Sequence, residues 1–113
     1  MSGVAFQALD NGKFQEGTAA AGNAGVSTVT APPQQTIIVT GISASYDIDV
    51  SAHKVITIDF GADVLSLDWD FTNGNFFFTF PGPISADRAT NVVATLPSHA
   101  GAVPIVNVFY FLN

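Results

Sequence analysis

The sequence contains no cysteine and few charged residues. Without cysteine there can be no disulfide framework, no thiolate nucleophile and no cysteine-based zinc site. Charged residues make up 11% of the 113 residues, less than half of the roughly 25% found in an average soluble domain. A free monomer normally covers its surface with such residues. We therefore expect another chain to cover part of the surface of this single small domain.

Positively charged residues are rarer than negatively charged ones. Lys13, Lys54 and Arg88 stand against nine acidic residues, which gives a formal net charge of −6. So few cations make binding to a nucleic-acid backbone or to an anionic membrane surface unfavourable. The first ten residues lack the basic start and apolar run of a secretory signal, and no window approaches the roughly 20 apolar residues of a membrane-spanning helix. We expect neither nucleic acid nor membrane as a partner.

Large apolar residues are sparse in the first part of the chain, which reads Gly-Thr-Ala-Ala-Ala-Gly-Asn-Ala-Gly from Gly17 to Gly25. Small residues alone bury too little apolar surface to offset the entropy lost on ordering. Residues 1–25 are therefore predicted to form an extended N-terminal arm that is weakly ordered in isolation. Phe6, Leu9 and Phe14 are apolar residues that a purely solvated tail would not need.

Helical periodicity is absent, and alternation of apolar and polar residues governs the chain from residue 26 onward. Strands separated by turns about every 8–12 residues are typical of a sandwich or barrel. The sequence predicts an all-β fold, a single antiparallel β-sandwich over residues 26–113. Its expected strands span residues 26–30, 36–40, 42–48, 55–60, 65–71, 76–80, 91–96 and 102–112. Gly41 is expected to mark a bulge or bend between the second and third of them.

Three turn signals suggest how these strands connect. Asn73-Gly74 favours a type I′ turn, so the strands before and after it are predicted to form a β-hairpin. Pro81-Gly82-Pro83 is expected to end the second strand of that hairpin, and Pro104 predicts an edge position or a bulge near the start of the last strand. The last strand is apolar on both faces, so we expect both of its faces to be covered.

Two pairs of carboxylates are the first candidates for chemistry. Asp47 with Asp49, and Asp68 with Asp70, lie two residues apart, and such pairs can bind calcium or act in acid–base catalysis. A solvated strand face explains both pairs more simply.

The two histidines, His53 and His99, fall in predicted turns, and no third metal ligand stands at a known spacing from either. No nucleophile elbow is present to make either of them a catalytic base. We expect no catalytic, metal or cofactor site and no enzyme.

Aromatic residues point instead to an interface. Phe76, Phe78 and Phe80 share one face of a strand, which leaves Phe77 on the other face, under a second layer or at a subunit contact. The predicted interface residues are Phe6, Phe14, Phe77 and Tyr110.

The order of these features resembles the small jelly-roll decoration or cement proteins of tailed bacteriophages. The residues that carry the resemblance are a Gly/Ala-rich start, then Val-Thr-Ala-Pro-Pro at 29–33, Thr-Ile-Ile-Val-Thr-Gly-Ile-Ser-Ala-Ser-Tyr at 36–46, Val-Ile-Thr-Ile at 55–58, Phe-Pro-Gly-Pro at 80–83 and the closing strand at 103–112. The resemblance implies a jelly roll, a homotrimer or homodimer, and a virion structural protein that clamps neighbouring capsid subunits. It further implies the major capsid protein as partner and the outer capsid surface as location, after synthesis in the host cytoplasm.

A second reading of the sequence is a carbohydrate- or receptor-binding sandwich, of the tail-fibre or lectin-like kind. Calcium at Asp47 and Asp49, or at Asp68 and Asp70, would suit that function.

Overall fold

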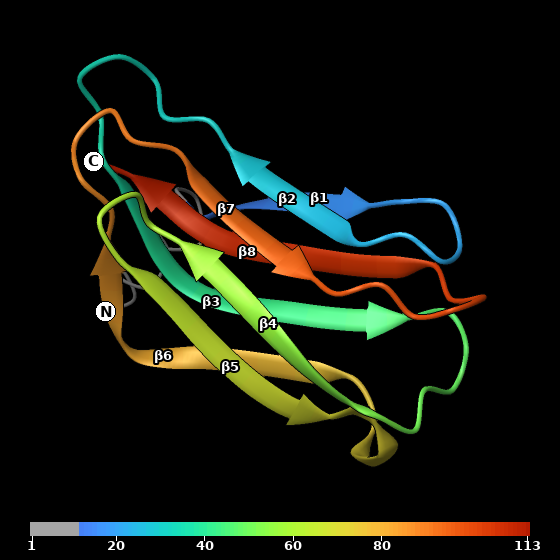
Figure 1. The fold of residues 1–113 in the computed structure, drawn as a ribbon. Coiled ribbons are helices and arrows are strands. Elements are labelled where there is room, and N and C mark those ends of the chain that lie inside the picture. Colours follow the sequence, from blue (N-terminus) through green and yellow to red (C-terminus); the bar gives the residue numbers. More distant parts are fainter. Residues whose placement is uncertain (1–11) are drawn as a thin grey trace.

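The computed structural model describes residues 12–113, which form eight strands and one short turn of 3-10 helix (Figure 1). The strands are β1 (Lys13–Thr18), β2 (Gly25–Val29), β3 (Ile37–Tyr46), β4 (His53–Asp59), β5 (Val64–Asp70), β6 (Phe76–Ser85), β7 (Val92–Leu96) and β8 (Pro104–Leu112). The turn, η1 (Phe71–Asn73), joins β5 to β6. No helix within residues 12–113 is long and apolar enough to cross a membrane.

The strands of this part of the chain form two antiparallel four-stranded sheets that pack face to face (Figure 1). One sheet has the order β1-β8-β3-β6 and the other has the order β2-β7-β4-β5. The predicted all-β antiparallel sandwich is thereby confirmed. Of the strands that follow one another in sequence, β4 and β5 pair, whereas each other connection crosses from one sheet to the other.

The core lies between the sheets and is built from alternate residues of most strands. In β7, for example, Val92, Ala94 and Leu96 are buried while the residues between them are partly exposed. The alternation in β3 shifts by one residue at Gly41 and Ile42, which are both buried, and a register shift between Val39 and Gly41 confirms the expected bulge. The largest fully buried aliphatic side chains are Val29, Ile37, Val39, Ile42, Ile56, Ile58, Val92, Leu96, Val106 and Val108.

One side of the sandwich is closed because β1 and β2, which belong to different sheets, approach each other closely. Gly17 is buried there, and a β-carbon at this position would overlap the backbone of Val26 and Ser27. The Ser27 hydroxyl, fully buried, donates a hydrogen bond to the Gln15 carbonyl over 2.7 Å. The edges of β1 and β2 therefore shield each other.

Strand β1 lies inside the segment that was predicted to be an arm. It pairs with β8 from Lys13↔Tyr110 to Thr18↔Ile105, so the sandwich includes residues 13–25 as well as 26–113. The alternation that identifies other strands is missing here because Gly17 is the one buried residue of β1. Of the predicted arm, residues 1–11, including Phe6, lie outside the described residues.

The predicted hairpin at Asn73-Gly74 is wrong. Strand β5 pairs with β4 and strand β6 pairs with β3, so the connection crosses between the sheets. The Asp70 side chain accepts a hydrogen bond from the Thr72 amide (2.9 Å) and caps η1 in place of a two-residue turn. Gly74 follows with φ 104° and ψ −168°, a backbone conformation far from that of a type I′ turn.

The expectations for Pro81-Gly82-Pro83 and Pro104 also need correction. Strand β6 does not end at these prolines but continues to Ser85. Its pairing with β3 jumps from Gly41↔Thr79 to Val39↔Ile84, so the prolines lie in a bulge, and β6 is an edge strand, where proline is tolerated. Strand β8 lies in the interior of its sheet, between β1 and β3. Pro104 is tolerated there because it is the first residue of the strand.

Candidate functional site

An aromatic row crosses the outer face of the β1-β8-β3-β6 sheet. The Phe109 ring lies 6.3 Å from the Phe14 ring and 5.7 Å from the Phe77 ring, between centroids. Phe14 and Phe77 are 64% and 67% exposed, while Phe109 between them is partly buried. Three rings from the first, last and sixth strands therefore form one continuous exposed surface, called the aromatic row below.

Strand register brings these three residues together. Phe14 stands directly opposite Phe109 in the β1–β8 pair, and Phe109 stands opposite Gly41 in the β8–β3 pair. Gly41 has no side chain, so Phe109 can reach past it to Phe77, which stands opposite the neighbouring Ser43. A β-carbon at Gly41 would also lie 2.8 Å from the Phe78 carbonyl oxygen. The glycine that forms the bulge in β3 thus makes room for the row.

The face that carries the aromatic row is nearly free of charge. On its four strands, alternation places Glu16 outward as the one ionisable residue among Ser, Thr, Asn, Ile and Phe side chains. A largely apolar groove of about 410 Å³ lies beside the row, and Lys13 is the one charged residue of its lining, which consists of Gly12, Lys13, Phe14, Thr40, Phe109, Tyr110 and Phe111. Aromatic residues without charge are the composition of protein–protein interface cores.

Of the predicted interface residues, the structure brings Phe14 and Phe77 together on the aromatic row. Tyr110 follows Phe109 in β8 and therefore points to the opposite face of the sheet, where its side chain packs against the core while lining one side of the groove. Phe109 takes the central position that sequence reasoning missed. Its place follows from the buried Val106 and Val108, whose parity makes Phe109 face outward.

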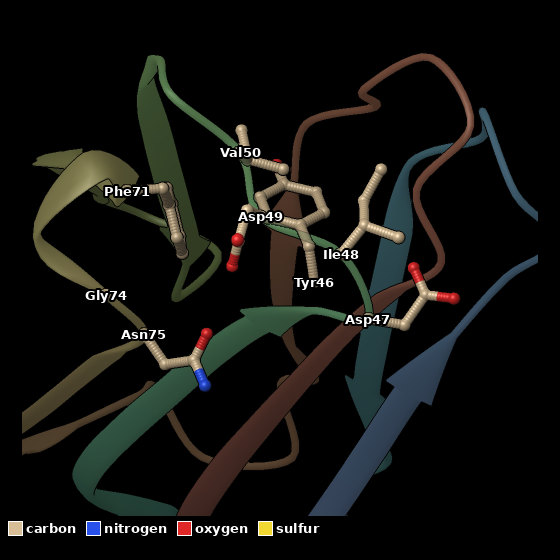
Figure 2. Close-up of a pocket in the computed structure, with 8 residues that line it drawn as sticks. All are labelled: Tyr46, Asp47, Ile48, Asp49, Val50, Phe71, Gly74 and Asn75. Atoms are coloured by element: carbon tan, nitrogen blue, oxygen red, sulfur yellow. The ribbon is translucent and has the colours of Figure 1, made fainter.

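A hollow of about 480 Å³ lies at one end of the sandwich, between the β3–β4 connection and the segment that follows η1 (Figure 2). Tyr46 and Phe71 form its apolar part, with rings 5.0 Å apart in an edge-to-face arrangement. Figure 2 shows that Asp47 and Asp49 point in different directions. The predicted pair therefore does not present two carboxylates to one ion.

The carboxylates of Asp47 and Asp49, both at this hollow, have different structural roles. Asp47 accepts a hydrogen bond from the Val103 amide over 2.7 Å, and its own amide donates to the Val103 carbonyl over 3.1 Å. These bonds fix the end of β3 to the start of β8. Asp49 is exposed at the rim, where Asn75 also presents a polar side chain. Asp49 and Asn75 are the polar groups that a ligand in the hollow would meet.

Tyr46 is the ionisable core residue at this end. Its hydroxyl donates a 2.6 Å hydrogen bond to the Pro97 carbonyl. Burial raises the pKa of Tyr46 to about 12, because the phenolate would lose its hydration. A neutral hydroxyl held as a donor is a structural group rather than an acid–base catalyst near neutral pH.

The second pair of carboxylates is brought together with a histidine on the outer face of the other sheet. His53 Nδ1 lies 3.3 Å from Asp68 Oδ1, and its Nε2 lies 3.4 Å from Asp70 Oδ2. Hydrogen bonds from the Thr72 side chain and amide lower the pKa of Asp70, and His53 lowers it further. His53 and Asp68 are well exposed, so their ion pair contributes little to stability.

The other histidine lies elsewhere, with the His99 ring 6.1 Å from the Tyr46 ring. Among residues 12–113, no group of three or more His, Asp or Glu side chains is arranged to hold a metal ion.

Comparison of the chain with protein-family models gives no match, and comparison with curated protein sequences gives none either.

Proposed function

We propose that the chain is a virion structural protein that binds the outside of a bacteriophage capsid and clamps neighbouring capsid subunits. The observation that carries this proposal is the aromatic row on a sheet face almost without charge. Its partner is the major capsid protein, and its place is the outer capsid surface after synthesis in the host cytoplasm. The proposal assigns the chain no catalytic role.

The energetics of the aromatic row favour a protein partner. Burying a phenylalanine side chain contributes about 1.5–3 kcal/mol, and Phe14 and Phe77 each leave most of their surface exposed. Large exposed apolar patches on small domains usually mark an interaction site. Exposed aromatic rings from three strands, without charged neighbours along the row, are the composition of the core of a protein–protein interface.

Strand order supports the structural part of the proposal. The sheet orders are β1-β8-β3-β6 and β2-β7-β4-β5, and every connection except β4–β5 crosses between the sheets. This arrangement fits the two Greek keys of an eight-stranded jelly roll. We propose that topology for this chain.

Cosedimentation with a panel of tailed-phage shells stripped of their own decoration proteins tests the proposal. The wild-type chain should pellet with at least one shell, and Phe77→Asp should bind that shell at least about tenfold more weakly, because a charge replaces a buried ring. Val26→Asp is the matched control, since Val26 is 46% exposed on the other sheet. Failure to bind any shell, or equal binding by wild type and Phe77→Asp, would contradict the proposal.

A second candidate, a carbohydrate- or receptor-binding module, has one observation in its favour: the hollow beside Asp49 and Asn75. Carboxylate and amide groups at a concave rim can bind sugar hydroxyls. Binding on a glycan array that Asp49→Ala abolishes and Phe77→Asp leaves intact would favour this function over the first. A melting temperature raised by calcium would support the lectin-like form of it.

A further inference from the structure

The edge of β5 is the unprotected edge of the described sandwich. The sheets of residues 12–113 have four edge strands, β1, β2, β5 and β6. Strands β1 and β2 shield each other at Gly17 and Ser27, and β6 is interrupted by the bulge at Pro81-Gly82-Pro83. Strand β5 has none of these devices: it pairs with β4 through seven residues without a register shift, and it contains no proline and no lysine.

An open edge of this kind is a template for another strand. Its unpaired amide and carbonyl groups gain hydrogen bonds when a strand is added, and proteins that must avoid such pairing blunt the edge with charged side chains (above all Lys), with Pro or with a bulge. The charged residues of β5 are Asp68 and Asp70, which share its outer face and leave the inner face apolar. β5 also carries apolar side chains that the monomer covers incompletely. Leu65, Leu67 and Trp69 are partly buried, and Phe78 on the neighbouring β6 is 37% exposed.

We propose that β5 pairs antiparallel with β5 of a second copy of this chain, about a two-fold axis at Ser66. This inference goes beyond the proposed function, because it concerns the edge of the other sheet and leaves the aromatic row free. The product is a dimer in which two four-stranded sheets join into one continuous sheet. Such a two-fold contact is closed, so it ends at two copies.

The sequence of β5 is complementary to itself in this register. With Ser66 opposite Ser66, Leu65 stands opposite Leu67 on the inner face, twice per dimer. Asp68 then stands opposite Val64, so no two carboxylates face each other across the contact. A strand of the same acidic chain is therefore accepted without the like-charge pairs that would destabilise it.

The test is the native mass of the full-length protein by light scattering over a concentration series, with two variants. Wild type should approach twice the mass of one chain. Ser66→Lys should raise the dissociation constant by at least about tenfold, because two introduced lysines meet at the two-fold axis. Thr28→Lys is the control: it introduces a lysine at an exposed position of β2, at the opposite edge of the same sheet, and should leave the dissociation constant unchanged.

Salt and hydrogen exchange add two independent readings. Because each chain carries a net charge of −6, added salt should lower the dissociation constant by screening repulsion between copies. Amides of β5 should exchange more slowly in concentrated than in dilute wild-type protein.

A trimer, a monomer at every concentration, or a dimer that resists Ser66→Lys would overturn the inference. So would β5 amides that are equally protected in the monomer, since another segment of the chain would then cover the edge. Shell binding by Phe77→Asp and native mass by Ser66→Lys are separate measurements, so failure of the dimer and failure of the capsid function can be told apart.

Discussion

Replacing Gly17 by alanine should break the closed side of the sandwich. The added methyl group would overlap the backbone of Val26 and Ser27, which cannot rotate away as a flexible side chain could. Overpacking of this kind costs about 1–3 kcal/mol, and separating the strands would also strain the buried hydrogen bond from Ser27 to Gln15, whose loss costs about 1–3 kcal/mol. We expect the free energy of unfolding to fall by roughly 2–6 kcal/mol.

A loss of that size is a large part of the total stability of a domain, which is typically about 5–15 kcal/mol. For a chain of this length, at about 4 °C per kcal/mol, it should lower the melting temperature by roughly 8–25 °C. Urea unfolding followed by the fluorescence of Trp69, the single tryptophan, gives the free energy directly, and circular dichroism checks that both probes move together.

The matched control for this substitution is Gly82→Ala. A β-carbon at Gly82 meets no atom within 4 Å, so this variant should keep its stability within about 0.5 kcal/mol of wild type. If Gly17→Ala unfolded at the same urea concentration as Gly82→Ala, β1 would not pack against β2. The close approach that closes the sandwich, and the assignment of residues 13–18 to it, would then be wrong.

Three further predictions concern hydrogen-bonded groups. Tyr46→Phe should lower the free energy of unfolding by about 1 kcal/mol, measured by urea titration at pH 7, because the Pro97 carbonyl loses its donor. Burial raises the pKa of Tyr46 from 10.0 to about 12, so its neutral form stabilises the fold below pH 10 and this contribution is lost as the pH rises through 12. Over that pH range the urea midpoint of the wild type should therefore fall more steeply than the urea midpoint of Tyr46→Phe. Hydrogen bonds from Thr72 lower the pKa of Asp70 below 3.8, so the Asp70 carboxylate stabilises the fold above that pH and this contribution is lost as the pH falls. Asp70→Asn keeps a capping oxygen, and its urea midpoint should drop less than that of the wild type between about pH 5 and pH 3. Equal drops would contradict the role of the carboxylate.

Local patterns predicted most of the strands because burial alternates in them. The buried residues of β7 and β3 follow the apolar residues of the sequence, and the bulge at Gly41 follows from a glycine within a β-branched run. β1 could not be found this way, because its partners are near the other end of the chain and its one buried residue is a glycine.

Local sequence patterns did not predict which strands pair with each other. Asn73-Gly74 is a strong turn signal, yet Trp69 donates from Nε1 to the Gly74 carbonyl and its ring packs 5.4 Å from Phe76. Those contacts are made across the two sheets, whereas a hairpin would place β5 and β6 side by side in one. Tertiary packing therefore decided the connection against the turn preference.

The candidate site could be predicted in part. Phe77 was expected to face away from the core because its neighbours Phe76 and Phe78 alternate with it. Its meeting with Phe14 and Phe109 depends on three strands that are distant in sequence, and on the absence of a side chain at Gly41. The aromatic row forms only when these strands pair in the observed register, and that register cannot be predicted from a single sequence.

The position of β8 between β1 and β3 has a consequence for biosynthesis. Lys13 pairs with Tyr110, so the β1-β8-β3-β6 sheet cannot be completed until nearly all of these residues have left the ribosome. Until then β1 and β3 lack the strand that separates them, and β6 can pair only with β3. Folding must therefore be late and dominated by long-range contacts, which makes it slow for a domain of this size. During that interval the chain is most exposed to aggregation.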